Sequence, residues 1–189
     1  MAGRRERKRA LRPLRRRGEV LRRKSRPGGL LNFRRFAVLI VVVLAADQLS
    51  KWLVLRFIPL HFSKPLLPFF CLTHVRNTGA AFGVYPQGNI FFIVMTLLIL
   101  VILMLYHRLL SGSFGSALGL ALVWAGALGN LVDRLFRGSV VDFLDFFVGT
   151  WHWYTFNVAD SAISIGIALL LLDSFRPKAP ADEPKTIGN

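Results

Sequence analysis

Polar residues at helical spacing stand out in a chain that is 53% hydrophobic. Asn130 and Asp133 are three residues apart, Arg134 is the next residue, and Asn157 precedes Asp160 by three. Side chains three or four apart share a helix face, so two Asn/Asp pairs could meet across a helix interface. Two carboxylates that meet in a low-dielectric setting share a proton. One protonated and one ionised carboxyl group can together activate water and polarise a peptide carbonyl, as aspartic proteases do.

Four apolar stretches must position these residues, and they span about 37–58, 90–106, 116–135 and 156–175. A helix needs about 20 residues to cross a hydrocarbon core about 30 Å thick. The sequence therefore predicts four transmembrane helices. A cleaved signal peptide does not fit the first stretch, because its apolar region would be only about 7 to 15 residues long.

The charge distribution predicts the orientation of these helices. Residues 1–35 hold 15 of the 25 Lys and Arg against two acids, so this arm carries +13 of the net charge of +15. The positive-inside rule places the arm in the cytoplasm, and four spans return the tail 176–189 to the same side. Segments 59–89 and 136–155 then face outward. Asp142 lies in the second of these segments, so the topology brings it to the same membrane face as Asp133 and Asp160.

The arm itself has two interpretations. It could be a solvated, disordered tail that fixes the membrane orientation, or an arm that binds RNA or lipid. Blocks of like charge are commonly disordered, and the arm has no aromatic residue for base stacking before Phe33. These observations favour the tail.

Other chemistries have less support. Paired carboxylates can bind a divalent cation, but such cations take about six oxygen ligands, and His61, His74, His107 and His152 have no metal-ligand spacing. We therefore expect no metal and no cofactor. The single Cys71 cannot form an intrachain disulfide.

A proton-relaying transporter is the alternative from another class, but it needs polar residues throughout the membrane depth, and the stretch 90–106 has no charged residue.

Three further features of the sequence could help to build the membrane domain. Asp47 and Lys51 are four residues apart in the first stretch and can neutralise each other within the membrane. The sequence NTGAAFG at 77–83 follows a β-prone run at 69–75 and could be a loop that leads into the second helix. Seven aromatic residues within 143–156 fit an interfacial belt, or the entrance for a lipid-borne substrate.

Four blocks occur in order on the predicted spans: DQLSKW at 47–52, NTGAAFG at 77–83, GALGNLVDRLFRGSVVDFLDF at 126–146 and FNVADSAISIG at 156–166. Together they resemble the lipoprotein signal peptidases, also called signal peptidase II, which are aspartyl peptidases of the bacterial inner membrane. The resemblance covers about 36–175. It implies an all-α membrane domain of four transmembrane helices, with a small outward-facing β-rich platform and an interfacial helix or loop.

The resemblance also implies an activity and a site. Such an enzyme cleaves the signal peptide of a prolipoprotein just before the cysteine that carries diacylglycerol. Asp142 and Asp160 correspond to the catalytic dyad, and a second set corresponds to residues that support the dyad, contact substrate or stabilise the first span: Asn77, Asn130, Asp133, Arg134, Asn157, Asp47 and Lys51.

The partners and the location follow from the same resemblance. We expect a monomer in the bacterial inner membrane with both termini in the cytoplasm, an active site near the outer face, prolipoprotein and membrane lipid as partners, and no nucleic acid. Family members commonly begin close to the first span, so the resemblance assigns no role to residues 1–35.

Overall fold

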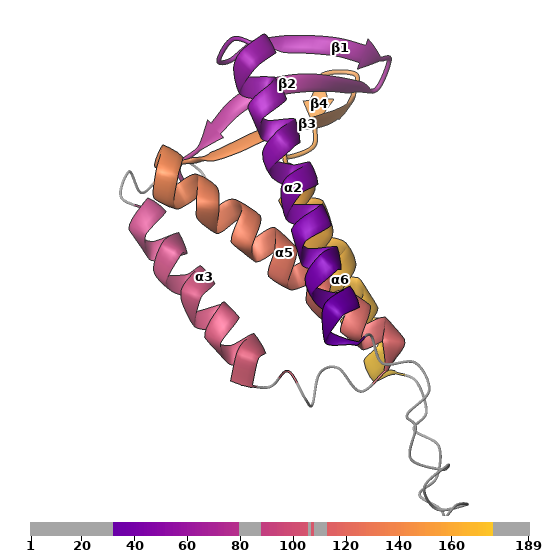
Figure 1. Ribbon diagram of the computed structural model, residues 1–189. Helices are drawn as coiled ribbons and strands as arrows, with labels where there is room; N and C mark the ends of the chain where they lie inside the picture. The colour runs from indigo at the N-terminus through magenta and orange to yellow at the C-terminus, as the bar shows by residue number, and fades with distance from the viewer. Residues whose placement is uncertain (1–31, 80–87, 106, 108–112, 176–189) are drawn as a thin grey trace, which may run out of the picture. The chain divides into compact units, whose positions relative to one another are not determined.

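The computed structural model describes residues 32–79, 88–105, 107 and 113–175. The basic arm up to residue 31, the last part of NTGAAFG from residue 80 and the tail 176–189 lie outside the described residues. In chain order the elements are α2 (Phe33–Phe57), β1 (Ser63–Leu67), β2 (Phe70–Asn77), α3 (Gly88–Leu105), α5 (Phe114–Arg137), β3 (Val140–Val148), β4 (Trp151–His152) and α6 (Val158–Ser174) (Figure 1). A helix is thus found at each of the four apolar stretches.

Three of the described helices, α2, α3 and α5, are long and apolar enough to cross a membrane. Helix α6 has 17 residues and is not among them, so its crossing stays a prediction. Many large apolar side chains of α2 and α3 are exposed, as expected for helices surrounded by lipid.

Helix α5 is the most buried of the three and packs against α2, α3 and α6. Small residues permit this close packing. A Cβ atom at Gly119 would lie 2.6 Å from the Gly166 carbonyl oxygen, and a Cβ atom at Gly166 would lie 2.6 Å from the Gly119 carbonyl oxygen. Both positions therefore need glycine to keep α5 and α6 in contact.

The four strands form one antiparallel sheet in the order β1-β2-β3-β4. The predicted β-prone run is confirmed as β2. Residues 140–148, between α5 and α6, form the long strand β3, which pairs with β2 and for which no strand was predicted. Gly138 ends α5 with a positive φ of 73°, a conformation that glycine adopts without strain, and this turn leads directly into β3.

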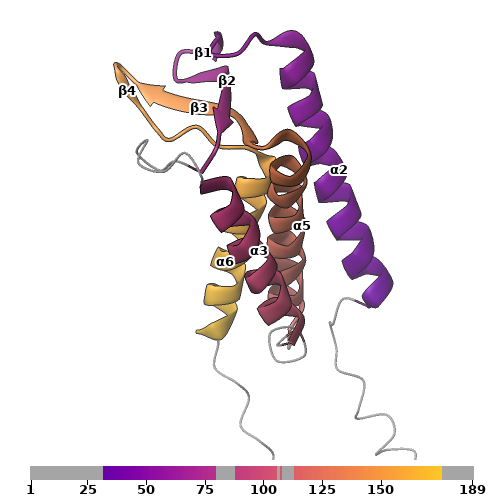
Figure 2. The same cartoon turned by 90° about the vertical axis from the view of Figure 1, so that its left-hand side faces the viewer.

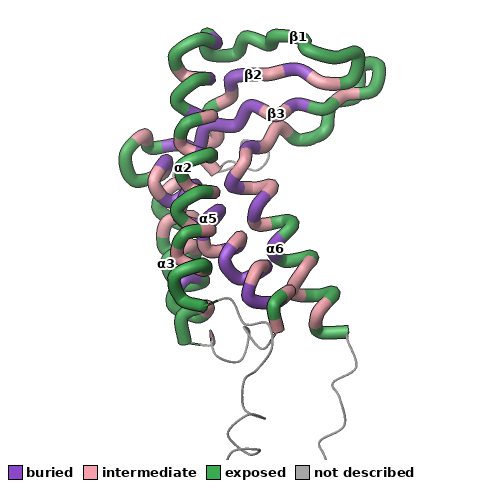
Figure 3. Tube along the Cα trace, turned by 45° about the vertical axis from the view of Figure 1, so that its right-hand side comes forward, coloured by how far each residue is buried: buried purple, intermediate pink, exposed green. Residues whose placement is uncertain are grey.

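The sheet lies at the end of the helices where α2 and α5 finish and α3 and α6 begin (Figures 1 and 2). Buried residues follow α5 and the inner strands β2 and β3 (Figure 3). A core of Val54, Ile58, Val141 and Phe143 joins α2 to β3. This core fixes the start of β3, and with it Asp142, against the helices.

Candidate active site

The start of α6 holds two of the predicted site residues. Asn157 is the N-cap, with an extended backbone, and its side-chain oxygen accepts a hydrogen bond from the Asp160 backbone N–H at 2.9 Å. The Asp160 carboxylate accepts in return from the Asn157 backbone N–H at 3.2 Å. The three-residue spacing is therefore a capping box and not a shared helix face, because Asn157 precedes the helix.

Asp142 approaches this helix start from the sheet. It lies on β3 opposite Val75 of β2 and is only 2% exposed. The Asn157 side-chain amide donates to its Oδ1 at 2.7 Å, and the Asn77 side-chain amide donates to its Oδ2 at 2.9 Å. Both oxygens of the carboxyl group are thus held by amides from different elements.

Asn130 of α5 completes the connection between the two carboxyl groups. Its Nδ2 donates to Asp160 Oδ1 at 2.7 Å, and its Oδ1 accepts from Asn157 Nδ2 at 3.2 Å. Asn157 also donates to both acids, through its side chain to Asp142 and through its backbone to Asp160. Two asparagines therefore hold the carboxyl groups of a strand and a helix in one cluster.

The environment of Asp142 favours its protonated form. Burial raises the pKa of Asp142 to about 6, and the nearby charge of Asp160 acts in the same direction, while the hydrogen bonds from Asn77 and Asn157 partly oppose the shift. Burial disfavours a charged carboxylate and a neighbouring carboxylate repels it. Asp142 can therefore retain a proton near pH 6.

Lys51 lies fully buried beside this cluster. Its ammonium group contacts Asp47 Oδ2 at 2.8 Å and Asp133 Oδ2 at 3.1 Å, and it donates to Asn130 Oδ1 at 3.1 Å. Asp47 and Lys51 thus form an ion pair as the spacing predicts, but Asp133 shares the same cation. Asp133 contacts this group and not the Asp142 and Asp160 carboxyls.

Sequence reasoning missed two members of this ionic group. Gln48 donates to Asp47 Oδ2 at 3.0 Å and to Asp133 Oδ1 at 3.3 Å, and Arg137 forms an ion pair with Asp133 Oδ1 while it donates to Gln48 Oε1 at 2.9 Å. The available signals were the position of Gln48 beside Asp47 and the four-residue spacing from Asp133 to Arg137. These contacts complete a set of two acids and two bases.

The Arg134 side chain makes no hydrogen bond to the other predicted site residues within the described chain, but its charge interacts with those of Asp160, Asp142 and Asp133. Its guanidinium lies over the Phe92 ring of α3, 5.1 Å from the ring centre, and its buried Nε has no hydrogen-bond partner within the part of the chain that is described. Arg134 therefore links α5 to α3.

Asn77 has a further neighbour that sequence reasoning missed. Its Oδ1 accepts from the Gly79 backbone N–H at 2.8 Å, and its Nδ2 donates to the Tyr154 hydroxyl at 3.0 Å as well as to Asp142. The pKa of Tyr154 is raised by partial burial and then by the charge of Asp142. No motif marked this tyrosine, which stands in the aromatic run that was interpreted as a belt or as a substrate entrance.

A second polar cluster surrounds Asp145, three residues after Asp142. Its carboxylate accepts from Thr73 at 3.1 Å and from the Cys71 thiol at 3.2 Å, and it pairs with His152 Nδ1 at 2.9 Å. Burial acts to raise the pKa of Asp145, but the hydrogen bonds from His152, Cys71 and Thr73 outweigh it and lower the pKa. Burial raises the pKa of the Cys71 thiol. This cluster fastens β4 to β3 and β2.

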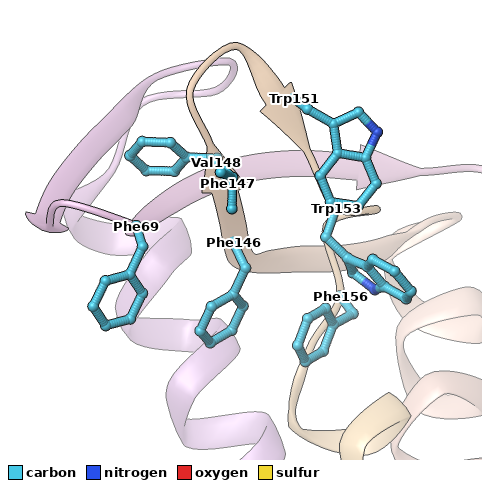
Figure 4. Close-up of a pocket in the computed structure, with 7 residues that line it drawn as sticks. All are labelled: Phe69, Phe146, Phe147, Val148, Trp151, Trp153 and Phe156. Atoms are coloured by element: carbon cyan, nitrogen blue, oxygen red, sulfur yellow. The ribbon is translucent and has the colours of Figure 1, made fainter.

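An apolar pocket of about 370 Å³ lies on the β3–β4 hairpin (Figure 4). It is lined by Phe69, Phe146, Phe147, Val148, Trp151, Trp153 and Phe156. Phe156 directly precedes the cap residue Asn157, so the pocket and the carboxyl cluster share one stretch of chain. The predicted aromatic run is thus folded into a surface beside the site.

No group of three or more His, Cys, Asp or Glu residues that could hold a metal ion occurs within residues 32–79, 88–105, 107 and 113–175. The four histidines are distributed over separate parts of the described chain. His152 contacts the Asp145 carboxylate.

Comparisons with known proteins agree on one family. A family model described as signal peptidase (SPase) II matches residues 39–176. The lipoprotein signal peptidase of Photorhabdus laumondii is 46% identical over 146 residues, which cover 75% of this chain and 87% of the relative. That of Desulforapulum autotrophicum is 43% identical over 153 residues, which cover 77% and 94%.

A solved structure gives the same result in three dimensions. A bacterial membrane enzyme determined by the in meso method at 2.3 Å resolution is similar, with a TM-score of 0.71 and 30% sequence identity. The match covers 82% of this chain and 98% of the solved one. The fold described above is therefore that of a membrane enzyme.

Proposed function

The chain belongs to the signal peptidase II family, and from this premise we propose that it removes the signal peptide from diacylglyceryl-modified prolipoproteins. The relatives are named lipoprotein signal peptidases. The peptide bond just before the lipidated cysteine is hydrolysed. Asp142 and Asp160 carry out this hydrolysis without a metal or cofactor.

One observation carries the assignment of the dyad. Asn157 donates a hydrogen bond to each acid, at 2.7 Å to Asp142 and at 3.2 Å to Asp160. A purely structural carboxyl pair gains nothing from this proximity, because like charges in a buried site raise the cost of ionisation. Two carboxyl groups held together by neutral amides are suited to share one proton.

The chemistry follows from that shared proton. Asp160, which lies at a helix N-terminus where negative charge is favourable, takes a proton from the attacking water. Asp142 keeps the shared proton and donates a hydrogen bond to the scissile carbonyl, which gains negative charge as the water oxygen bonds to its carbon. The C–N bond then breaks, and the proton taken from water is delivered to the leaving amine.

The other predicted site residues support this pair. Asn77, Asn130 and Asn157 orient the two carboxyl groups through their amides. Lys51 with its partner acids Asp47 and Asp133 anchors α2 to α5, and Arg134 remains available for a substrate contact near α3.

The membrane placement is part of the proposal. Helices α2, α3, α5 and α6 cross the bacterial inner membrane. The sheet faces outward because it lies at the C-terminal end of α2 (Figure 1), whereas the basic residues that the positive-inside rule assigns to the cytoplasm precede the N-terminus of α2 in the sequence. Residues 1–35 form a cytoplasmic arm, 36–175 form the peptidase domain, and 176–189 form a cytoplasmic tail. The enzyme acts as a monomer, and its substrate enters from the outer leaflet.

The test is cleavage of a purified, diacylglyceryl-modified prolipoprotein by Asp142→Asn and Asp160→Asn. Each variant should lose turnover by several orders of magnitude, because an amide can neither take nor give the required proton. Asp145→Asn is the matched control, since it removes a buried carboxylate from the same strand outside the dyad. It should retain most of its turnover per folded molecule.

Two results would contradict the mechanism. Retained turnover in either dyad variant would remove that residue from the chemistry, and loss of wild-type activity with a metal chelator would exclude the metal-free reaction. Deletion of residues 1–31 should leave cleavage intact, which would separate the arm from the catalytic domain.

A further inference from the structure

Tyr154 occupies a position beside the dyad. It follows β4, is 65% exposed, and its hydroxyl oxygen lies 3.0 Å from Asn77 Nδ2. The same amide nitrogen lies 2.9 Å from Asp142 Oδ2. One side-chain amide therefore separates an exposed phenol from a proposed catalytic acid.

The direction of these hydrogen bonds can be assigned. The Gly79 backbone N–H donates to Asn77 Oδ1 at 2.8 Å, which fixes the oxygen end of the carboxamide. The two N–H groups at the other end then serve Asp142 and Tyr154, one each. Tyr154 must therefore accept from Asn77.

A phenol that accepts a hydrogen bond still has its own O–H to donate. No acceptor for the Tyr154 O–H occurs among the residues that the structure describes. Partial burial and the charge of Asp142 raise the pKa of Tyr154, so the hydroxyl keeps its proton throughout the neutral range. The result is a fixed donor that is directed by Asn77 and open to solvent.

We propose that the Tyr154 hydroxyl is a further substrate-binding group, which donates a hydrogen bond to a main-chain carbonyl of the substrate next to the cleaved bond. The proposal rests on the function proposed above. When a peptide places its scissile carbonyl against Asp142, the main-chain carbonyls on either side of the scissile bond also lie close to Asp142. These are the acceptors that an exposed phenol one amide away can reach.

The side chain of Tyr154 can hold its hydroxyl group in one position with little loss of conformational entropy. A tyrosine has two side-chain torsions, so little conformational entropy is lost when it is held in place. Asn77 holds the hydroxyl end through the 3.0 Å bond. The preceding residue is fixed as well, because the Trp153 backbone N–H donates to the Phe146 carbonyl at 2.7 Å.

Tyr154→Phe tests the proposal, because it removes only the hydroxyl from an exposed ring. Wild type and variant are compared in steady-state cleavage of a diacylglyceryl-modified prolipoprotein peptide. The expected result is a fall in kcat/KM of about two- to tenfold, the usual range for one hydrogen bond between neutral groups. Leu66→Ala is the control, since Leu66 is an exposed residue of strand β1 that lies outside the aromatic pocket and the carboxyl cluster, and it should show the wild-type kcat/KM within twofold.

A second measurement distinguishes a substrate contact from an effect on Asn77. The peptide is made with a thioamide at each carbonyl that flanks the scissile bond, one at a time, because sulfur accepts hydrogen bonds more weakly than oxygen. At one of these positions the thioamide should reduce kcat/KM for the wild type but not for Tyr154→Phe, which gives a coupling in the double-mutant cycle. The pH dependence of kcat should be the same for both enzymes.

The outcomes separate the two proposals. An active wild type with unchanged kcat/KM in Tyr154→Phe would overturn the role of Tyr154 and leave the peptidase function standing. A shifted pH profile without any thioamide coupling would also overturn it, because the hydroxyl would then act only through Asn77 and Asp142. A wild type that does not cleave the peptide would reject the peptidase function, and the Tyr154 proposal with it.

Discussion

Replacement of Lys51 by methionine is the most direct test of the ionic group that anchors the site. Methionine is unbranched like lysine and fills similar space but carries no charge. In the native protein the ammonium group contacts Asp47 Oδ2 at 2.8 Å, Asp133 Oδ2 at 3.1 Å and Asn130 Oδ1 at 3.1 Å, and all of Lys51, Asp47 and Asp133 are inaccessible to solvent. Lys51→Met therefore leaves two buried carboxylates without the cation between them.

The contacts that Asp47 and Asp133 keep in Lys51→Met determine how much folding stability this variant loses. Removal of one partner of a buried ion pair costs about 3–5 kcal/mol, because the other charge is left uncompensated. Asp47 keeps a hydrogen bond from the Ala159 backbone N–H at 2.9 Å, and Asp133 keeps the Val141 backbone N–H at 3.0 Å and its ion pair with Arg137. We therefore expect a loss near the lower limit, about 3 kcal/mol, which is a large part of the usual 5–15 kcal/mol of folding stability.

The assay is equilibrium unfolding in mild detergent titrated with a denaturing detergent. Arg56→Met is the matched control, since Arg56 is an exposed base on the same helix, and it should change the free energy of unfolding by less than about 0.5 kcal/mol. Adding Asp47→Asn to Lys51→Met should recover at least about 1 kcal/mol by removing one uncompensated charge. A Lys51→Met protein within about 1 kcal/mol of wild type would refute the reasoning, because breaking a buried pair should cost more.

Three other predictions follow from distances and titration. The kcat/KM of the free enzyme should fall as the pH rises above about 6, because Asp142, whose pKa is raised to about 6 by burial, then loses the shared proton; a flat profile from pH 6 to 8 would contradict this. Asn77→Ala should move that fall to higher pH in the same assay, since the lost amide holds the pKa down. Gly129→Ala should lower the free energy of unfolding by about 1–3 kcal/mol, because its Cβ would lie 2.6 Å from Asp47 Oδ2. Gly115→Ala, whose Cβ would meet no heavy atom closer than 3.5 Å, should change it little, and equal values for the two variants would contradict the packing argument.

The helices could be predicted from the sequence more readily than the sheet. Each helix is a long apolar run, and its limits follow from local composition. Strand β3 has no such signal, because its sequence VVDFLDFFV does not alternate between polar and apolar residues and its partner β2 lies more than 60 residues earlier. Pairing between distant segments is not encoded in a local pattern. The aromatic residues of β3 were therefore interpreted as a membrane belt or a substrate entrance, and not as part of a strand.

The residues of the candidate site were proposed from the sequence, but their contacts could not be predicted from it. The pair Asn157 and Asp160 was placed on one helix face, although an asparagine just before an apolar run is also a signal for an N-cap. The topological argument could bring Asp133 to the same membrane face as the dyad, but it could not show that Asp133 bonds Lys51 and Arg137. These partners depend on side-chain directions that spacing alone does not give.

The position of Lys51 gives a physical reason for the asparagines that surround the proposed dyad. Within the described residues its ammonium group makes no direct contact with Asp142 or Asp160. It donates to Asn130 at 3.1 Å, and Asn130 donates to Asp160 at 2.7 Å, while its charge is the smallest of the named influences on Asp142. A direct ion pair would favour the ionised form of a carboxyl group by up to several kcal/mol and so remove the proton that the two acids share in the proposed mechanism. A neutral amide fixes the carboxylate in place but adds no net charge. Lysine can thus stabilise the helix interface while the two acids keep the protonation states that the proposed hydrolysis requires.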